Sequence, residues 1–149
     1  MKICFVCHGN ICRSPMAEYV FKNMLKEDGY KNYEVVSKAT SYEEIGSDIH
    51  FGTKDILVKY NIPFEKRKAT KLLKDDYEKC DYFIGMDDAN IRNMKNIFEG
   101  DYKNKIIKLL DLTSNKGDVA DPWYTGDFEK TYYDINIGCI YLLKFLNKM

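Results

Sequence analysis

The residues whose types and spacing could do chemistry lie close together near the start of the chain, between positions 7 and 15. This segment begins with a cysteine, Cys7, and has an arginine near its end, Arg13. A cysteine thiolate is a strong nucleophile, and a planar guanidinium can hold two oxygens of one phosphate group. The pair therefore predicts that Cys7 attacks a phosphoryl group held by Arg13, with a phosphocysteine as the intermediate.

The same segment has the composition of an anion-binding loop that opens a helix. A short apolar run at 2–6 predicts a buried strand before it, and Ser14 followed by Pro15 predicts a helix start with Ser14 as the N-cap. Backbone N–H groups at a helix N-terminus are unpaired and partly positive, so a loop that curls there can cradle a phosphate. Gly9 permits the tight curl. We expect the phosphate-binding residues to be His8, Gly9, Asn10, Ile11, Cys12, Arg13 and Ser14.

A second candidate for chemistry is Asp121, which lies far along the chain in a loop expected from 111 to 126. The leaving oxygen of a phosphate ester needs a proton, and a carboxylic acid can donate it. Pro122 restricts the backbone of Asp121 to extended conformations and stiffens the loop. We therefore expect Asp121 to act first as the general acid and then as the base that activates water. Trp123 and Tyr124 could flank a ring-bearing leaving group.

Strands and helices alternate along the chain. Apolar runs predict the strands, and helical periodicity with start and stop residues predicts the helices. Alternation of this kind is typical of right-handed βαβ units, so we predict an α/β fold with a single doubly wound, four-stranded parallel sheet flanked by helices. Ligands of such sheets bind beyond the carboxyl ends of the strands, where the loop after the first strand would lie. The expected strands span 2–6, 33–39, 82–86 and 105–110, and the expected helices span 14–29, 52–59, 87–98 and 128–146.

The overall composition argues against several classes of protein. With 149 residues, of which 45% are hydrophobic and 31% charged, the chain is expected to form one soluble domain over 1–149. Lys plus Arg and Asp plus Glu number 23 each, so no basic field suggests a nucleic acid or a membrane as a partner. The apolar runs are too short to span a bilayer.

The five cysteines, Cys4, Cys7, Cys12, Cys80 and Cys139, are odd in number and irregular in spacing. A secreted disulfide framework is therefore not expected, and a reducing, cytoplasmic compartment fits better. Neither a second cysteine pair nor a nearby histidine completes a tetrahedral zinc set with the first three cysteines. We accordingly expect neither a metal nor an organic cofactor.

Taken together, the motifs at 7–15 and 121–124 resemble those of the low-molecular-weight protein tyrosine phosphatases. The resemblance covers nearly the whole chain and includes the stretches at 81–84 and 86–90. It implies that the substrate is a phosphotyrosine-containing protein. We expect the protein to be a monomer or a weak homodimer.

The resemblance also assigns roles to individual residues. It implies that Cys7 is the nucleophile, Arg13 the phosphate clamp and Asp121 the general acid. Asn10 would hold the shape of the loop, and Ser14 would donate a hydrogen bond to the Cys7 thiolate.

A redox role for Cys12 also follows from the resemblance. In the family, the second cysteine of the loop can form a reversible disulfide that protects the nucleophile, so we expect Cys12 to pair with Cys7 under oxidation. The alternative is that the small side chain of Cys12 only fills the interior of the loop.

Some positions depart from the family pattern. An aromatic wall is often present at the position of Glu43, and here Tyr42 lies one residue earlier. We therefore expect a substrate pocket formed by Tyr42, Glu43, Trp123 and Tyr124, in which the acidic wall would repel acidic phosphopeptides. A histidine that many members use to brace the loop asparagine is replaced by Arg67, which leaves the supporting network open.

Other functions compete on the same scaffold. A protein arginine phosphatase shares the fold and the loop, but that activity is associated with threonine at the position of Ile11. A thioredoxin-coupled arsenate reductase needs a further cysteine near the end of the third strand, where Met86 and Asp87 stand, whereas Cys80 precedes that strand. A phosphate-binding module without catalysis has no need of Asp121. We therefore favour the tyrosine phosphatase.

Overall fold

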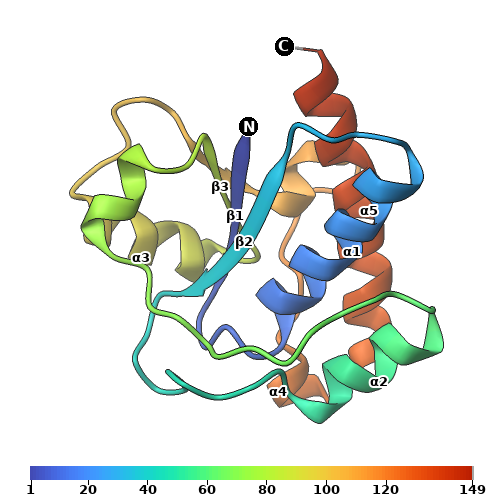
Figure 1. Cartoon of the computed structure of the whole chain (residues 1–149). Coiled ribbons are helices and arrows are strands. Elements are labelled where there is room, and N and C mark those ends of the chain that lie inside the picture. The colour runs from blue at the N-terminus through green and yellow to red at the C-terminus, as the bar shows by residue number, and fades with distance from the viewer. Residues whose placement is uncertain (149) are drawn as a thin grey trace.

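The centre of the fold is a parallel sheet of four strands. In the computed structural model, which describes residues 1–148, the strands lie in the order β2-β1-β3-β4 (Figure 1). Strand β1 pairs with both β2 and β3, so that Cys4 lies opposite Val36 on one side and Phe83 on the other. The predicted four-stranded parallel sheet is confirmed. The strand bounds are Lys2–Cys7 for β1, Glu34–Ala39 for β2, Tyr82–Gly85 for β3 and Ile106–Lys108 for β4.

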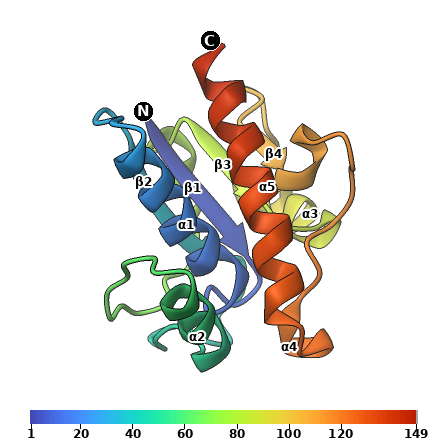
Figure 2. The same ribbon diagram turned by 90° about the vertical axis from the view of Figure 1, so that its right-hand side faces the viewer.

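Helices cover both faces of this sheet. The α-helices span Arg13–Glu27 (α1), Phe51–Lys59 (α2), Asp88–Phe98 (α3), Pro122–Thr125 (α4) and Phe128–Asn147 (α5), and two 3₁₀ helices span Lys74–Glu78 (η1) and Leu109–Leu112 (η2). Helices α1, α2 and α5 lie on one side of the sheet, and α3 and η1 lie on the other (Figures 1 and 2). This is the doubly wound arrangement predicted from the alternation of elements. No helix within residues 1–148 combines the length and the apolar character needed to cross a membrane.

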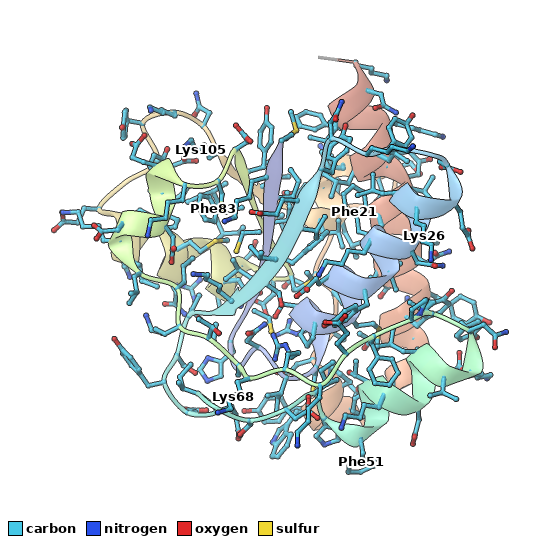
Figure 3. The ribbon with its side chains drawn as sticks, viewed as in Figure 1. Phe21, Lys26, Phe51, Lys68, Phe83 and Lys105 are labelled. Carbon is cyan, nitrogen blue, oxygen red and sulfur yellow. The ribbon has the colours of Figure 1, made fainter. Side chains whose placement is uncertain are left out.

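Strand β1 is buried on both faces because its side chains alternate between two hydrophobic clusters. Phe5 packs on the side of α1 and α5, where its ring meets Phe21 edge to face at 5.8 Å. Val6 packs on the opposite side, in the cluster that contains Phe83. Figure 3 shows Phe21 and Phe83 on either side of the central strands. The strand that ends at Cys7 is therefore anchored from both layers of the fold.

The first helix begins earlier than predicted. Helix α1 starts at Arg13 with Cys12 as its N-cap residue, and no side chain caps its first turn. The prediction that Ser14 is the N-cap is therefore wrong. The reason is that the hydroxyl of Ser14 faces the sulfur of Cys7 and the side-chain amide of Asn10 instead.

The fourth strand is shorter than predicted. Strand β4 ends at Lys108, and the chain then turns into η2, which places Leu109 against α5. A Cβ atom added at Gly138 of α5 would lie 2.4 Å from Cγ of Leu109, so the glycine makes room for the leucine. The stretch 111–126, predicted as a loop, also contains the end of η2 and the short helix α4.

Candidate active site

Cys7 is the last residue of β1, and the loop that follows folds back over its side chain. The backbone N–H groups of Asn10 and Ser14 donate to Cys7 Sγ at 3.3 and 3.4 Å. The hydroxyl of Ser14 lies 3.1 Å from the same sulfur. Ser14 Oγ also accepts a hydrogen bond from Asn10 Nδ2 at 2.7 Å, and its own hydrogen is free to donate when the sulfur is a thiolate. Two backbone donors and one hydroxyl therefore converge on one sulfur atom.

Asn10 shapes this loop from the inside. Its backbone has a φ of 60°, in the left-handed region that asparagine adopts more readily than most residues. Besides Ser14, its Nδ2 donates to Ser37 Oγ at 2.9 Å. Its Oδ1 accepts from the backbone N–H of Thr70 at 3.1 Å and from Arg67 Nη2 at 2.6 Å. Most of these partners lie far from the loop in sequence, so the loop conformation depends on the tertiary fold.

Arg67 is the main brace of Asn10. Its Nη1 donates to the carbonyl of Asn10 at 2.7 Å, and its Nη2 contacts both Asn10 Oδ1 and Ser37 Oγ. Ser37 in turn donates to Glu18 Oε1 at 2.6 Å. Burial lowers the pKa of Arg67, and the negative charge of Glu18 opposes this shift. The arginine that replaces the expected histidine thus takes part in a connected network around the loop.

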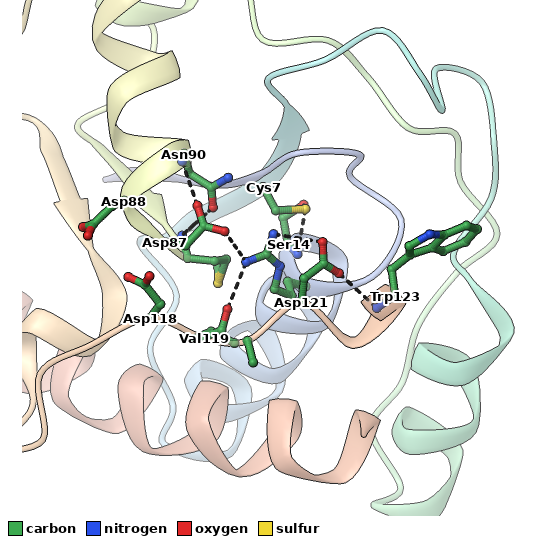
Figure 4. Close-up of polar contacts among 12 residues, drawn as sticks. Cys7, Ser14, Asp87, Asp88, Asn90, Asp118, Val119, Asp121 and Trp123 are labelled. Carbon is green, nitrogen blue, oxygen red and sulfur yellow. Dashed lines mark hydrogen bonds and ion pairs between the residues drawn. The ribbon is translucent and has the colours of Figure 1, made fainter. Parts of the chain in front are cut away.

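Arg13 opens α1 and lines the pocket with a side chain that is only 3% exposed. Its Nη1 donates to Asp87 Oδ2 at 2.7 Å and to the carbonyl of Val119 at 2.9 Å, and its Nη2 lies 3.4 Å from Asp121 Oδ2 (Figure 4). Burial disfavours the charged guanidinium, but negative charge on Cys7 and the hydrogen bond to Asp87 outweigh it and raise the pKa of Arg13. Because Nη1 is engaged twice, Nε and Nη2 form the edge that remains for a bidentate ligand.

Asp121 is held at the start of α4 by its own side chain. Oδ1 accepts a hydrogen bond from the backbone N–H of Trp123 at 3.0 Å, while Oδ2 faces Arg13. The segment just before it is tied to the end of β3, since the backbone N–H of Val119 donates to the carbonyl of Met86 at 2.9 Å. The motifs at 7–15 and 121–124, which are far apart in the sequence, therefore meet beside the side chain of Arg13.

These groups share one pocket at the carboxyl end of β1. Asn10 and Ser14, which we predicted among the phosphate-binding residues, do not line it because both are fully buried beside Cys7. Within residues 1–148, no three His, Cys, Asp or Glu side chains are close enough to form a metal site. The lining residues are Cys7, His8, Gly9, Ile11, Cys12, Arg13, Glu43, Glu44, Asp121, Trp123 and Tyr124.

Tyr42 was predicted to line the pocket, and the structure shows that it does not. This residue is 72% exposed and lies outside the pocket, with Lys71 Nζ 4.8 Å from the centre of its ring. Glu43 lines the wall as predicted, with Oε2 2.9 Å from His8 Nε2, and Glu44 lies beside it. The chain turns at 40–46, so that consecutive side chains reach the same pocket. The sequence offered no signal for this turn geometry.

An aromatic cluster around His50 is a part of the site that sequence reasoning missed. The imidazole stacks on Phe51 at 4.4 Å and on Phe128 at 5.3 Å, and it meets the ring of Trp123 edge-on at 5.7 Å. Its backbone N–H donates to the carbonyl of Ile11 at 2.9 Å. His50 therefore connects the phosphate loop with the wall formed by Trp123.

Cys12 lies in the interior of the loop, where it packs with Ile11 and Ala69. Burial and the negative charge of nearby Cys7 raise the pKa of Cys12 to about 12. Its thiol is therefore protonated at neutral pH, and any disulfide with Cys7 would begin with oxidation of the other sulfur. The redox role of Cys12 stays a prediction.

Almost the whole chain matches one known protein family. The family described as low molecular weight phosphotyrosine protein phosphatase matches residues 2–149. The chain belongs to the low-molecular-weight protein tyrosine phosphatases. It is 39% identical over 147 residues to the low-molecular-weight protein-tyrosine-phosphatase PtpA of Staphylococcus haemolyticus. The aligned region covers 98% of this chain and 94% of that protein.

Solved structures of similar sequence share the fold. The low-molecular-weight protein tyrosine phosphatase of Streptococcus pyogenes is 41% identical and superposes with a TM-score of 0.87. The superposition covers 97% of this chain and 92% of that chain. YfkJ from Bacillus subtilis, 36% identical, has a TM-score of 0.93 with coverage of 99% and 95%. The chain is thus a cysteine-dependent protein tyrosine phosphatase, as predicted. In this low-molecular-weight phosphatase, Cys7, Arg13 and Asp121 meet in a single pocket.

Proposed function

We propose that this enzyme hydrolyses phosphotyrosine in proteins through a phosphocysteine formed on Cys7, and that residues 1–149 act as one phosphatase domain. The observation that carries the proposal is the convergence of two backbone N–H groups and a hydroxyl on Cys7 Sγ, in a pocket shared with Arg13 and Asp121. Hydrogen bonds to sulfur at a helix N-terminus stabilise a thiolate. A nucleophile, a cation and a proton donor in one pocket are what phosphoryl transfer requires.

In the first step, the Cys7 thiolate attacks phosphorus, and a sulfur–phosphorus bond forms as the phosphorus–oxygen bond to the tyrosine breaks. Arg13 holds two equatorial oxygens with Nε and Nη2, and the N–H groups of the loop hold the others. Asp121 donates its proton from Oδ2 to the phenolate oxygen, because Oδ1 is held by the N–H of Trp123. The products of this step are the dephosphorylated tyrosine and the phosphocysteine.

In the second step, water attacks the phosphocysteine. The Asp121 carboxylate, now deprotonated, accepts a proton from this water. The sulfur–phosphorus bond breaks, inorganic phosphate leaves, and Cys7 is released as a thiolate that again receives hydrogen bonds from Asn10 and Ser14. Arg13 stabilises the charge on the equatorial oxygens in both steps.

The walls of the pocket support an aryl leaving group. Trp123 and Tyr124 line it with exposed rings, and the branched side chain of Ile11 adds an apolar surface. A flat phenyl ring packs well against such surfaces. A phosphotyrosine side chain could therefore bind with its phosphate in the loop and its ring against these residues.

Phosphoarginine is a second candidate substrate because two carboxylates, Glu43 and Glu44, line the same pocket. A guanidinium could pair with either of them. Ile11 favours tyrosine, since its apolar side chain offers a guanidinium no hydrogen bond. Phosphoarginine and phosphotyrosine peptides of matched sequence should be assayed side by side. A clear preference for phosphoarginine would overturn the proposal.

Arsenate reduction finds little support in the positions of the cysteines. That reaction needs cysteines that resolve an arsenylated nucleophile in turn. Cys80 packs in the hydrophobic cluster beside α3, and Cys139 packs in the cluster beside α1, so neither lines the pocket. Only Cys12 accompanies Cys7 among the pocket residues that the structure describes.

The experiment that tests the proposal is hydrolysis of p-nitrophenyl phosphate, measured with and without EDTA, for the wild type, Cys7→Ser and Asp121→Ala. We expect turnover in the wild type that EDTA does not change, none in Cys7→Ser, and strongly slowed turnover in Asp121→Ala. Absence of turnover in freshly reduced wild type would contradict the enzymatic role. Persistent activity in Cys7→Ser would show that another residue is the nucleophile.

A further inference from the structure

Lys108, the last residue of β4, does not line the pocket, yet it binds two segments that contact Arg13. Its Nζ donates to Asp88 Oδ1 at 2.8 Å and to Asp118 Oδ1 at 2.9 Å, and it lies 3.8 Å from Asp111 Oδ1. The lysine side chain is only 11% exposed, whereas these carboxylates face solvent. The hydrogen bonds to Asp88 and Asp118 raise the pKa of Lys108, so the ammonium stays charged at neutral pH.

Each hydrogen-bonded partner of this ammonium is the sequence neighbour of a partner of Arg13. Asp88 follows Asp87, whose Oδ2 accepts from Arg13 Nη1 at 2.7 Å. Asp118 precedes Val119, whose carbonyl accepts from the same nitrogen at 2.9 Å. Figure 4 shows Asp87 and Asp88 on one segment and Asp118 and Val119 on another. The side chains of Asp88 and Asp118 lie close to each other. One lysine thus joins the two segments that orient the guanidinium.

Without this ammonium, the two segments would repel each other. Asp88 and Asp118 would face each other with like charges, and Asp111 lies close to the same point. The two segments would still be linked by the hydrogen bond from the N–H of Val119 to the carbonyl of Met86 and by the hydrophobic cluster that contains both residues. An exposed ion pair contributes little by itself, but here the ammonium of a largely buried lysine side chain bridges two separate segments.

We propose that Lys108 is a positioning residue for Arg13, and that it sets the guanidinium orientation by holding Asp88 and Asp118 together. This inference rests on the proposed role of Arg13 as the phosphate clamp. Loss of the bridge lets Asp87 and Val119 shift, and the edge of Arg13 that faces the phosphate turns with them. A small misplacement of a clamp costs much of its effect on binding and rate.

The test compares Lys108→Met, Lys108→Arg and Lys38→Met. Lys38 is the matched control, because its Nζ binds Asp76 at 3.1 Å and it does not line the pocket. For Lys108→Met we expect about a tenfold weaker competitive inhibition by inorganic phosphate and about a tenfold lower kcat/KM for p-nitrophenyl phosphate. Lys108→Arg should restore most of both values, and Lys38→Met should change neither.

Unchanged inhibition by phosphate in Lys108→Met, beside an active wild type, would overturn this inference and leave the proposed function intact. An inactive wild type would instead contradict the proposed function, and calorimetric binding of phosphate to both proteins would still test Lys108. If Lys108→Met does not fold, the double variant Asp88→Ala, Asp118→Ala, which removes both acceptors of the Lys108 ammonium, takes its place. That variant should also bind phosphate about tenfold more weakly, and normal binding would overturn the inference.

Discussion

Arg67 shows how a single residue can hold the shape of the phosphate loop. It supplies donors to both the backbone carbonyl and the side-chain oxygen of Asn10, and it contacts Ser37 on β2. Asn10 is fully buried; without the guanidinium its carbonyl oxygen would lose a donor, and its Oδ1 would keep only the N–H of Thr70. Buried acceptors that lose their donors are costly.

We predict that Arg67→Met lowers the free energy of unfolding by about 2 kcal/mol, because buried oxygens of Asn10 lose hydrogen bonds. We also expect kcat/KM to fall about tenfold as the loop loses its conformation. Urea unfolding and p-nitrophenyl phosphate kinetics measure the two effects. Lys68→Met, at the exposed neighbouring position, is the control. A variant with wild-type stability and kinetics would refute the bracing role.

The charge of the pocket wall leads to a prediction about selectivity. Glu43 should favour a phosphotyrosine peptide flanked by lysines over one flanked by aspartates. We expect Glu43→Lys to shift the ratio of kcat/KM for the two peptides about tenfold towards the acidic one, with a smaller shift at high salt. Glu65→Lys, on a groove beside α1, is the control. An unchanged ratio would mean that flanking residues do not reach the wall.

The meeting of Cys7, Arg13 and Asp121 in one pocket could be predicted because their patterns are local. Cys7 and Arg13 lie in one short motif, and Asp121 stands beside a proline and aromatic residues. The position of Tyr42 outside the pocket and the contribution of His50 could not be predicted in the same way. They depend on a turn and on rings brought together by the tertiary fold, which periodicity does not reveal.

Among the elements, the interface between η2 and α5 is unusually close. Gly138 faces Leu109 so tightly that a methyl group would overlap its side chain. The pattern of apolar residues predicted the helix and the strand at either side of this contact, but not the point at which the strand ends. That point is decided by packing against α5, which lies much later in the sequence.

We predict that Gly138→Ala destabilises the fold by about 1–3 kcal/mol, although alanine favours a helix. The methyl group would displace Leu109 from α5, and overpacking of this kind outweighs the gain in helix propensity. Thermal unfolding followed by circular dichroism measures the change. Ile140→Ala, at a partly exposed position of the same helix, should have a much smaller effect. A more stable Gly138→Ala would show that the interface can relax.

For the molecule as a whole, Asp48 helps to hold the long connection between β2 and η1 around the phosphate loop. Its Oδ1 accepts from the backbone N–H groups of Ile49 and Arg67, and its Oδ2 accepts from Lys54 Nζ at 2.7 Å. The hydrogen bond from Lys54, assisted by these backbone donors, lowers the pKa of Asp48 to about 2. The carboxylate is therefore favoured by the folded state.

The pKa of Asp48 is lower in the folded state than in the unfolded state, where it is about 4. The ionised carboxylate therefore stabilises the fold at a pH above about 4, and this stabilisation is lost as the pH falls towards 2. We predict that Asp48→Asn lowers the free energy of unfolding at pH 7 by about 1 kcal/mol, after allowance for solvent screening. The difference from the wild type should vanish near pH 2. Urea unfolding across this range tests it, with Asp55→Asn on the surface of α2 as the control. A difference that does not depend on pH would contradict the ionic role.

Strand β1 lies between two parallel neighbours and two helical layers, so the segment that ends at Cys7 should be more stable against local opening than the segment around Asp121. The backbone amides that lead to Cys7 should exchange with deuterium only when the whole fold opens. Helix α4 is one turn long and carries the exposed rings of Trp123 and Tyr124, so the amides around Asp121 should exchange through small local openings. On gradual warming, the enzyme would therefore lose the proposed proton donor, Asp121, before the proposed nucleophile, Cys7.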